Sequence, residues 1–193
     1  MAKNNNRKYE IIETAKVLFV EQGVDGTSMD QIAKKMQLTK ASLYYYFKSK
    51  DELLEEMLKE STTRLMKHFM TERNKYLKAK ESNHKQDFKP DFSMYIEERD
   101  VLRIGLGEAL KKGNDGKFFK DLTQTIIEGQ QEEIEDEQRI FLCISGTLIA
   151  TYFTLKEDIS KGLGIEEEKV DKVFEEKYEA LFVKIAKSMM MGE

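Results

Sequence analysis

A single proline, Pro90, stands in this chain of 193 residues, and its isolation constrains the fold more than any other feature. Average usage near 5 % would supply about ten prolines. Each would end or kink a helix, because proline lacks a backbone N–H and clashes with the preceding turn. Charged residues make up 35 % of the chain and hydrophobic residues 40 %, which suits amphipathic helices. We therefore predict an all-α protein of one or two domains.

The cysteine content and the apolar segments indicate the cellular compartment in which the protein works. Cys143 is the only cysteine, so neither an intramolecular disulfide nor a thiolate-rich zinc site can form. The polar, basic N-terminus has no apolar segment behind it that would indicate a secretory signal. The longest uncharged run, 140–155, has 16 residues, short of the roughly 20 that cross a bilayer. We expect a cytoplasmic protein without a membrane span.

Charge is distributed unevenly along the chain. Residues 1–50 contain nine Lys/Arg and five Asp/Glu, a net charge of +4, which leaves −8 on residues 51–193. A small basic segment joined to an acidic one is compatible with a nucleic-acid-binding domain followed by a domain of another function. Solvated helical surfaces can carry similar charge imbalances, so the charge supports DNA binding only if the basic segment also contains a DNA-docking motif.

The basic segment contains the pattern of three helices. An apolar stripe predicts a first helix over about 7–22. Ser28, followed three residues later by Gln31, forms a capping box that predicts a second helix over roughly 29–36, and a third is predicted over 40–47. Two short helices joined by a tight turn and braced by a longer one make a helix-turn-helix, whose second short helix enters the DNA major groove.

The outward face of the third predicted helix separates this arrangement from an ordinary helical hairpin. It carries hydrogen-bonding groups, aromatic rings and one small residue: Thr39, Lys40, Ala41, Ser42, Tyr44, Tyr45 and Lys48. A core helix would be apolar there, and a merely solvated helix would favour Glu, Lys and Gln over three successive tyrosines. The pattern favours a recognition helix.

Two stretches carry a family resemblance: GTSMDQIA at 26–33 and LTKASLYYYFKSKDELL at 38–54. The segment 7–58 closely resembles the DNA-binding region of the TetR family of bacterial regulators. One departure is Gln37, because the family commonly has glycine in the turn between the second and third helices. A left-handed backbone at this position would cost a non-glycine residue about 1 kcal/mol.

The resemblance implies two domains. Residues 1–50 would form an N-terminal three-helix helix-turn-helix DNA-binding domain, and residues 51–193 a C-terminal helical ligand-binding and dimerisation domain. A long amphipathic helix that begins near Lys50 and runs well past residue 65 would join them. In the family this helix transmits ligand occupancy to the DNA-binding head.

The resemblance also implies roles for the residues that match the motif. Hydroxyls, amides at helix N-termini and ammonium groups would hold DNA phosphates through Thr27, Ser28, Tyr45 and Lys50. The groove-facing part of the third helix would read bases through Thr39, Lys40, Ala41, Ser42 and Tyr44, with Lys48 on the same DNA-binding face. Lys3, Arg7 and Lys8 would add contacts from a mobile N-terminal arm, whereas Tyr46 is predicted to pack inward.

Apolar patterns in the C-terminal region predict helices over 92–110, 117–128 and 140–155, and another from about 165 onward. A two-fold protein reads a near-palindromic operator with half-sites about 34–36 Å apart, so the resemblance implies a homodimer. The predicted four-helix interface contains Ile140, Ile144, Leu148, Val173, Phe174, Leu181, Phe182 and Ile185. The alternative is that these helices form only an intramolecular core.

A ligand pocket in the C-terminal region would be lined by apolar and aromatic side chains with a few polar ones. The candidates are Phe69, Met70, Met94, Tyr95, Phe118, Phe119, Thr147, Thr151 and Tyr152. Aromatic and methionine side chains at helical spacing also suit an ordinary core. The ten methionines indicate an adaptable interior that would suit an apolar or amphipathic small-molecule effector.

The alternative class is an enzyme, and the sequence contains few residues that could carry out catalysis. His68 and His84 are 16 residues apart, with no histidine or cysteine at ligand spacing beside either, so we expect two surface histidines and no metal site. Cys143 lies in the apolar run, where burial would raise its pKa and make it inert. The acidic stretch 132–137 suits the exposed first turns of a helix better than a metal site. Because no glycine-rich phosphate loop follows a strand, we expect neither catalysis nor a cofactor.

The sequence therefore predicts a DNA-binding transcriptional regulator, most simply a ligand-responsive homodimeric repressor. Its expected partners are double-stranded operator DNA, a second copy of the chain and an unknown small-molecule effector. A protein-protein adaptor that had kept the fold without binding DNA would lack Lys40, Tyr44, Tyr45 and Lys50, and all four are present.

Overall fold

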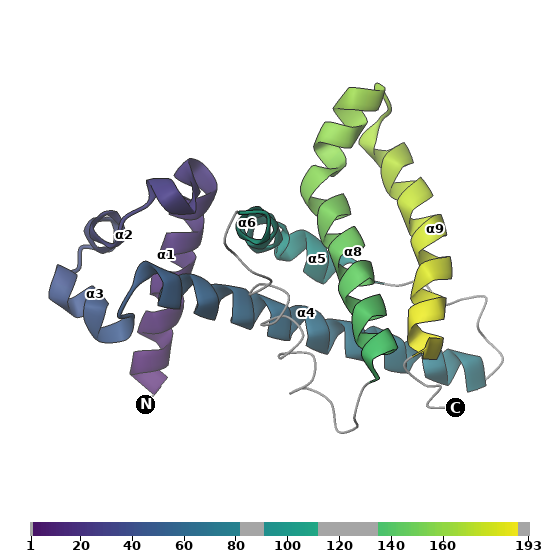
Figure 1. Cartoon of the computed structure of the whole chain (residues 1–193), viewed down its shortest axis with the longest axis horizontal. Helices are drawn as coiled ribbons and strands as arrows, with labels where there is room; N and C mark the ends of the chain where they lie inside the picture. Colours follow the sequence, from purple (N-terminus) through teal and green to yellow (C-terminus); the bar gives the residue numbers. More distant parts are fainter. Residues whose placement is uncertain (1, 82–90, 112–134, 189–193) are drawn as a thin grey trace.

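The computed structural model of the chain describes residues 2–81, 91–111 and 135–188 (Figure 1). Every regular element in these three ranges is an α-helix, which confirms the all-α prediction. None of these helices combines the length and apolarity that crossing a bilayer requires.

The first three helices form the head of the molecule. They are α1 (Ala2–Gly26), α2 (Met29–Lys35) and α3 (Lys40–Tyr46). The backbone of α1 leaves helical geometry at Gly23, with φ 78° and ψ 162°, so the prediction that the first helix ends near residue 22 is confirmed. The start of α1 differs from the prediction: the helix begins at Ala2, so Arg7 and Lys8 lie within it and not on a mobile arm.

One long helix, α4 (Lys50–Glu81), leads from the head along the foot of the remaining helices (Figure 1). Above it lie α5 (Ser93–Glu97), α6 (Arg99–Ala109), α8 (Asp136–Leu163) and α9 (Glu167–Ser188). The antiparallel pair α8 and α9 is joined by a short turn in which Gly164 has φ 64°. The helix predicted over 117–128 lies outside the described residues.

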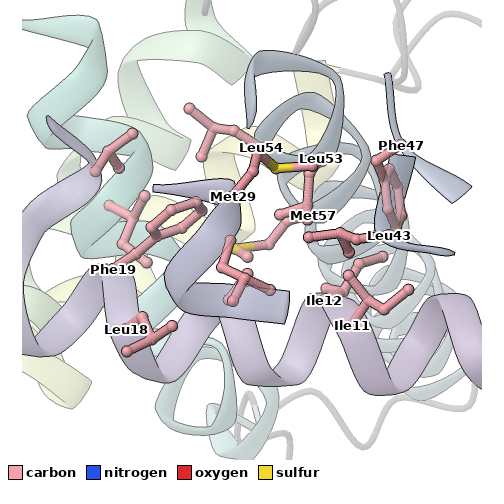
Figure 2. Close-up of a cluster of buried hydrophobic side chains, with 14 of the residues drawn as sticks. Ile11, Ile12, Leu18, Phe19, Met29, Leu43, Phe47, Leu53, Leu54 and Met57 are labelled. Atoms are coloured by element: carbon pink, nitrogen blue, oxygen red, sulfur yellow. The ribbon is translucent and has the colours of Figure 1, made fainter. Parts of the chain in front are cut away.

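The head core is built from the apolar stripes that the sequence shows. Ile11, Phe19 and their neighbours on α1 pack against Met29 of α2 and Leu43 of α3 (Figure 2). Ile32 of α2 belongs to the same buried cluster. The same buried cluster continues through Leu53, Leu54 and Met57 of α4 to Val101 and Ile104 of α6. The head is therefore joined to the first helices of the C-terminal region by shared burial as well as by the chain, and the boundary at residues 50 and 51 stays a prediction.

A second buried cluster, rich in aromatic rings, lies at the far end of α4. Phe69 and Tyr76 of α4 meet Tyr152 and Phe153 of α8 and Tyr178 of α9. Phe92, Tyr95 and Phe174 pack around them, and the Tyr152 and Phe174 rings stack with centroids 3.5 Å apart. This aromatic cluster and the head core bracket the middle of α4.

Candidate DNA-binding surface and effector cavity

Local backbone chemistry sets the angle between α2 and α3. Ser28 caps α2 in the predicted capping box: its hydroxyl accepts the Gln31 N–H while the Gln31 side chain accepts the Ser28 N–H. After α2, Gln37 has φ 55°. This is the left-handed conformation that was predicted because the family commonly has glycine at this position. The Leu38 N–H then donates to the Ala33 carbonyl at 2.9 Å and closes the turn. Both predicted features of the helix-turn-helix are confirmed.

The outward face of α3 presents the aromatic and polar groups that the sequence indicated. Leu43 is buried in the head core, whereas Tyr44 and Tyr45 are 39 % and 75 % exposed. Ala41 and Lys48 are exposed as well. Tyr46 packs against the head core, as predicted. This face can therefore meet a groove without unpacking any part of the head.

Two groups at the N-terminus of α3 already have partners within the chain. Thr39 caps the helix by accepting the Ser42 N–H at 3.1 Å, and the two hydroxyls lie 2.8 Å apart. The Lys40 ammonium pairs with the Asp30 carboxylate at 2.9 Å. That carboxylate raises the pKa of Lys40, so the side chain is cationic but must exchange Asp30 for a base edge or a phosphate when it binds DNA. Sequence spacing did not reveal this competition.

The loop before α2 differs from its expected role. Thr27 is 2 % exposed, and its hydroxyl donates inward to the Gly23 carbonyl at 2.8 Å. The prediction that this hydroxyl faces a phosphate is corrected, because it holds the end of α1 instead. Lys50 donates to the Val24 and Thr27 carbonyls at 2.6 and 2.9 Å. Since an ammonium has three donors, Lys50 fixes the loop and keeps one N–H for a phosphate.

The basic residues predicted for the arm are engaged on the helix surface. Arg7 pairs with Glu10 at 2.5 Å, and the Lys8 ammonium lies 5.3 Å from the centre of the Phe47 ring. The side chain of Lys3 lies outside the described residues. No separate arm is therefore visible in the part of the chain that the structure describes.

A cavity of about 110 Å³ opens between the head core and the aromatic cluster. Three of the predicted pocket residues line it: Phe69, Tyr95 and Thr147. Met70, Met94, Thr151 and Tyr152 do not, and Phe118 and Phe119 lie outside the described residues. The other walls, which periodicity could not separate from core, are Leu58, Ser61, Thr62, Leu65, Met66, Val101, Leu102, Gly105, Leu106, Ser145, Gly146, Ile149, Ala150 and Tyr178.

A charged pair stands beside this cavity. Arg64 of α4 donates to both carboxylate oxygens of Glu98 at 2.6 and 3.1 Å, where α5 passes into α6. Burial acts to raise the pKa of Glu98, but hydrogen bonds from Arg64 and Ser61, together with the Arg64 charge, outweigh it and hold that pKa below its usual value. Because Ser61 and Val101 of the cavity wall each lie three residues from a member of the pair, the ionic link ties the two walls together.

The predicted dimer residues whose side chains the structure describes divide into two groups. Ile140, Ile144 and Leu148 of α8 are exposed and recur every four residues, and Val173 of α9 is exposed too. Phe174 is partly buried and stacks within its own chain, so the structure places it in the aromatic cluster, and its interface role stays a prediction. The side chains of Leu181, Phe182 and Ile185 lie outside the described residues.

The remaining sequence expectations concern Cys143, the acidic stretch and His68. Burial raises the pKa of the Cys143 thiol, as predicted. Asp136 and Glu137 are exposed in the first turn of α8, and the earlier part of 132–137 lies largely outside the described residues. His68 is not an isolated surface residue, because its ligand atom lies within 4.8 Å of those of Glu72 and Asp91. Asp91 is 23 residues from His68, too far apart for a spacing rule to find.

Comparisons with known proteins agree with this geometry. The model of the family described as bacterial regulatory proteins, tetR family, matches residues 11–57. The regulator IcaR of Staphylococcus aureus strain Newman is 31 % identical over 192 residues, 93 % of this chain and 100 % of that protein. IcaR of Staphylococcus epidermidis strain ATCC 35984 is 48 % identical over 46 residues, 24 % of this chain and 25 % of that protein. Both are described as HTH-type negative transcriptional regulators of the biofilm operon icaADBC.

The family match covers the three head helices from the α1 core to Met57 on α4, and the similarity to the Staphylococcus aureus protein extends over both regions of the chain. The capped α2, the left-handed turn and the exposed face of α3 are the physical counterparts of that match. The chain therefore belongs to the TetR family of DNA-binding transcriptional regulators.

Proposed function

We propose that the chain is a homodimeric repressor whose affinity for its operator falls when a small molecule fills the cavity beside α4. One observation carries the ligand response: Val101 lines the cavity and is also buried in the head core. A ligand that separates α4 from α6 must therefore move atoms against which the head packs. Since packed interiors rearrange and do not compress, such a shift alters the orientation of the head.

On the DNA, α3 enters the major groove and the flanking groups set its register. Tyr44, Ala41 and the released Lys40 meet base edges, while Ser28, Tyr45 and Lys48 meet phosphates. The exposure of Tyr44 and Tyr45 beside buried Leu43 supports this division. The relatives' description as negative regulators supports repression. A repressor acts where its operator lies, so we infer a cytoplasmic protein without a catalytic role.

The exposed stripe on α8 supports the homodimer. Ile140, Ile144 and Leu148 would leave three large apolar side chains in water on an isolated chain, and Val173 extends them onto α9. Burying such a stripe against its two-fold copy removes this surface from water and presents two heads to a palindrome.

The cavity indicates the class of effector. Its walls are mainly aliphatic and aromatic, with hydroxyls from Ser61, Thr62 and Thr147. The Ser61 hydroxyl is buried in the wall and lies beside Glu98, whose pKa it helps to lower. We infer a small, neutral, mainly apolar molecule, because the walls offer hydroxyls but no charged group.

The first experiment is a titration of the full-length protein against the DNA that flanks its own gene, beside random DNA of equal length and at two salt concentrations. Repression predicts a palindromic footprint with affinity about 10³-fold or more above random DNA. Weak binding that is equal on both DNAs and disappears at moderate salt would contradict operator recognition at this site.

The effector cavity is tested with glycine variants. A Cβ built on Gly146 meets no atom of the described residues within 4 Å, so Gly146→Leu should place its side chain in the cavity without disturbing α8. Gly107→Leu is the matched control, because Gly107 is also helical and open but does not line the cavity. Small neutral aromatic compounds that raise the Tm of the parent and of Gly107→Leu should lose this effect in Gly146→Leu. Equal shifts in all three proteins would place binding elsewhere.

A further inference from the structure

Three side chains that can bind a metal ion converge where α4 meets the segment before α5. His68 and Glu72 are four residues apart and so share one face of α4, and Asp91 lies across from them. One ligand atom from each lies within 4.8 Å of the others. Two hydrogen bonds hold this geometry: His68 Nε2 lies 2.6 Å from the Asp91 carbonyl, and the Asp91 N–H donates to Glu72 at 3.2 Å.

The burial of Glu72 sets this cluster apart from an ordinary surface group of charges. Its side chain is 4 % exposed, and a buried carboxylate needs a cation or several donors to offset the loss of water. Lys75 provides a cation at 2.5 Å, but its own side chain is 60 % exposed. The Lys75 ammonium can therefore return to water at little cost when a stronger cation competes for the carboxylate.

A small void adjoins the same three residues. It has a volume of about 10 Å³, and its polar walls are His68, Glu72 and Asp91. The remaining walls are the rings of Phe69, Phe92, Tyr95 and Tyr178. This volume is close to that of one water-sized sphere, so it suits a single ion or water and excludes an organic ligand.

We propose that His68, Glu72 and Asp91 form a binding site for one divalent transition-metal ion, with Zn²⁺ as the best match. One imidazole and two carboxylates are a ligand set that zinc accepts at about 2.0–2.2 Å, with water completing a tetrahedron. The imidazole disfavours Mg²⁺ and Ca²⁺, which prefer oxygen ligands. Binding displaces Lys75 from Glu72 and replaces the hydrogen bond from His68 to Asp91 with metal bonds.

The position of the site gives the metal a structural consequence. Phe69, Tyr95 and Tyr178 line both the void and the larger cavity. A metal that ties α4 to Asp91 would therefore fix one wall of the effector cavity. The assignment of the site does not depend on operator binding or on an effector, because it rests on the three side chains alone.

The experiment is a calorimetric titration of the full-length protein with Zn²⁺, repeated with Co²⁺, whose absorption spectrum reports its ligands. The proposal expects one ion per chain and no comparable binding of Mg²⁺. His68→Gln should weaken binding at least about tenfold, a loss of about 1.4 kcal/mol. His84→Gln is the matched control, because His84 is the only other histidine in the chain. Its affinity should equal that of the parent.

Lys75→Gln supplies an independent test that leaves every ligand in place. Removing the competing ammonium should tighten Zn²⁺ binding several-fold, whereas a hydrogen-bonded clamp without metal affinity predicts no binding in any variant. The proposal is overturned if the parent binds no stoichiometric Zn²⁺, if His84→Gln removes binding while His68→Gln retains it, or if Lys75→Gln weakens it. Circular dichroism of each variant confirms that the helices are intact.

Discussion

At the scale of single residues, internal partners decide what the head can offer to DNA. Lys40 is held by Asp30, whereas Tyr44 and Tyr45 of the same helix face solvent. Both members of the Lys40–Asp30 pair are about 60 % exposed, so water already screens their attraction and the exchange of partner costs little. The tyrosines need no such exchange.

The first prediction separates base reading from phosphate binding on α3. Tyr44→Ala should reduce discrimination between operator and random DNA by about 1–3 kcal/mol, because a contact to a base edge is lost. Lys48→Ala should weaken both DNAs alike and lower the salt slope by about one unit, because a phosphate contact is lost. Fluorescence anisotropy titrations at several salt concentrations measure both quantities. Equal losses on both DNAs for both variants would refute the division.

The second prediction concerns Lys50, whose ammonium bridges two backbone carbonyls. Lys50→Ala should lower the free energy of unfolding by about 1–3 kcal/mol, because the Val24 and Thr27 carbonyls lose a charged donor. Urea denaturation measures the change, and Lys48→Ala is the exposed control. A Lys50 variant that is fully stable and loses only DNA affinity would show that the phosphate role dominates.

At the scale of elements, the turn between α2 and α3 holds one residue in a disfavoured backbone conformation. Gln37 has φ 55°, a region that a side chain with a Cβ disfavours and glycine enters freely. The hydrogen bond from Leu38 to Ala33 and the burial of Leu43 hold the turn in place. The head therefore keeps the helix-turn-helix geometry despite an unfavourable residue.

Gln37→Gly should relieve this strain and raise the free energy of unfolding by about 0.5–1 kcal/mol, because the gain exceeds the added entropy of glycine in the unfolded chain. Chemical denaturation gives the value, and DNA affinity should not fall. Gln22→Gly serves as the contrast, since Gln22 lies in the helical part of α1 and glycine there should destabilise. A loss of stability in Gln37→Gly would show that the turn is not strained.

At the scale of the whole molecule, α4 and α6 connect the head to the C-terminal helices through a shared core and an ionic link. Val101 and Ile104 extend the head core, and Arg64 joins α4 to Glu98. Glu60, one turn before Arg64, has a pKa raised by burial, whereas Glu98 has a lowered one. Ionisation of Glu98 therefore stabilises the folded state, whereas ionisation of Glu60 destabilises it.

The pH dependence follows from these signs. Because the pKa of Glu98 is lowered in the folded state, its contribution to stability is present above the unfolded pKa of about 4.3 and is lost as pH falls further. The stability difference between the parent and Glu98→Gln should accordingly shrink on acidification below about pH 5. Glu60→Gln should show the opposite sign at neutral pH, because charging the partly buried Glu60 opposes folding. Urea unfolding curves across this pH range test both.

The exposed stripe on α8 makes a prediction about assembly. Ile144→Glu places a charge in the proposed interface, so sedimentation should show monomers and operator binding should fall steeply. Ile96→Glu is the control, because Ile96 is an exposed apolar residue on α5, away from the stripe. A dimeric Ile144→Glu variant, or a monomeric parent, would contradict the assignment.

Most local features of the head could be predicted from the sequence because their causes lie within a few residues. The capping box joins residues three apart, the break at Gly23 follows from one glycine, and the inward face of α3 follows from helical spacing. The predicted start of α1 was wrong, because nothing in the local sequence marks where a polar N-terminal helix begins.

The sequence by itself determined the helices, the helix-turn-helix and the chemical character of the recognition face. Only the tertiary structure decided that Thr27 is buried and that Lys50 donates to two backbone carbonyls. It also formed the cavity between the head core and the aromatic cluster, and it placed His68 beside Asp91. The physical reason is the distance along the chain between the residues that interact. Helix period and capping depend on neighbours in the chain, whereas burial, pairing and cavity walls depend on which distant helices pack together.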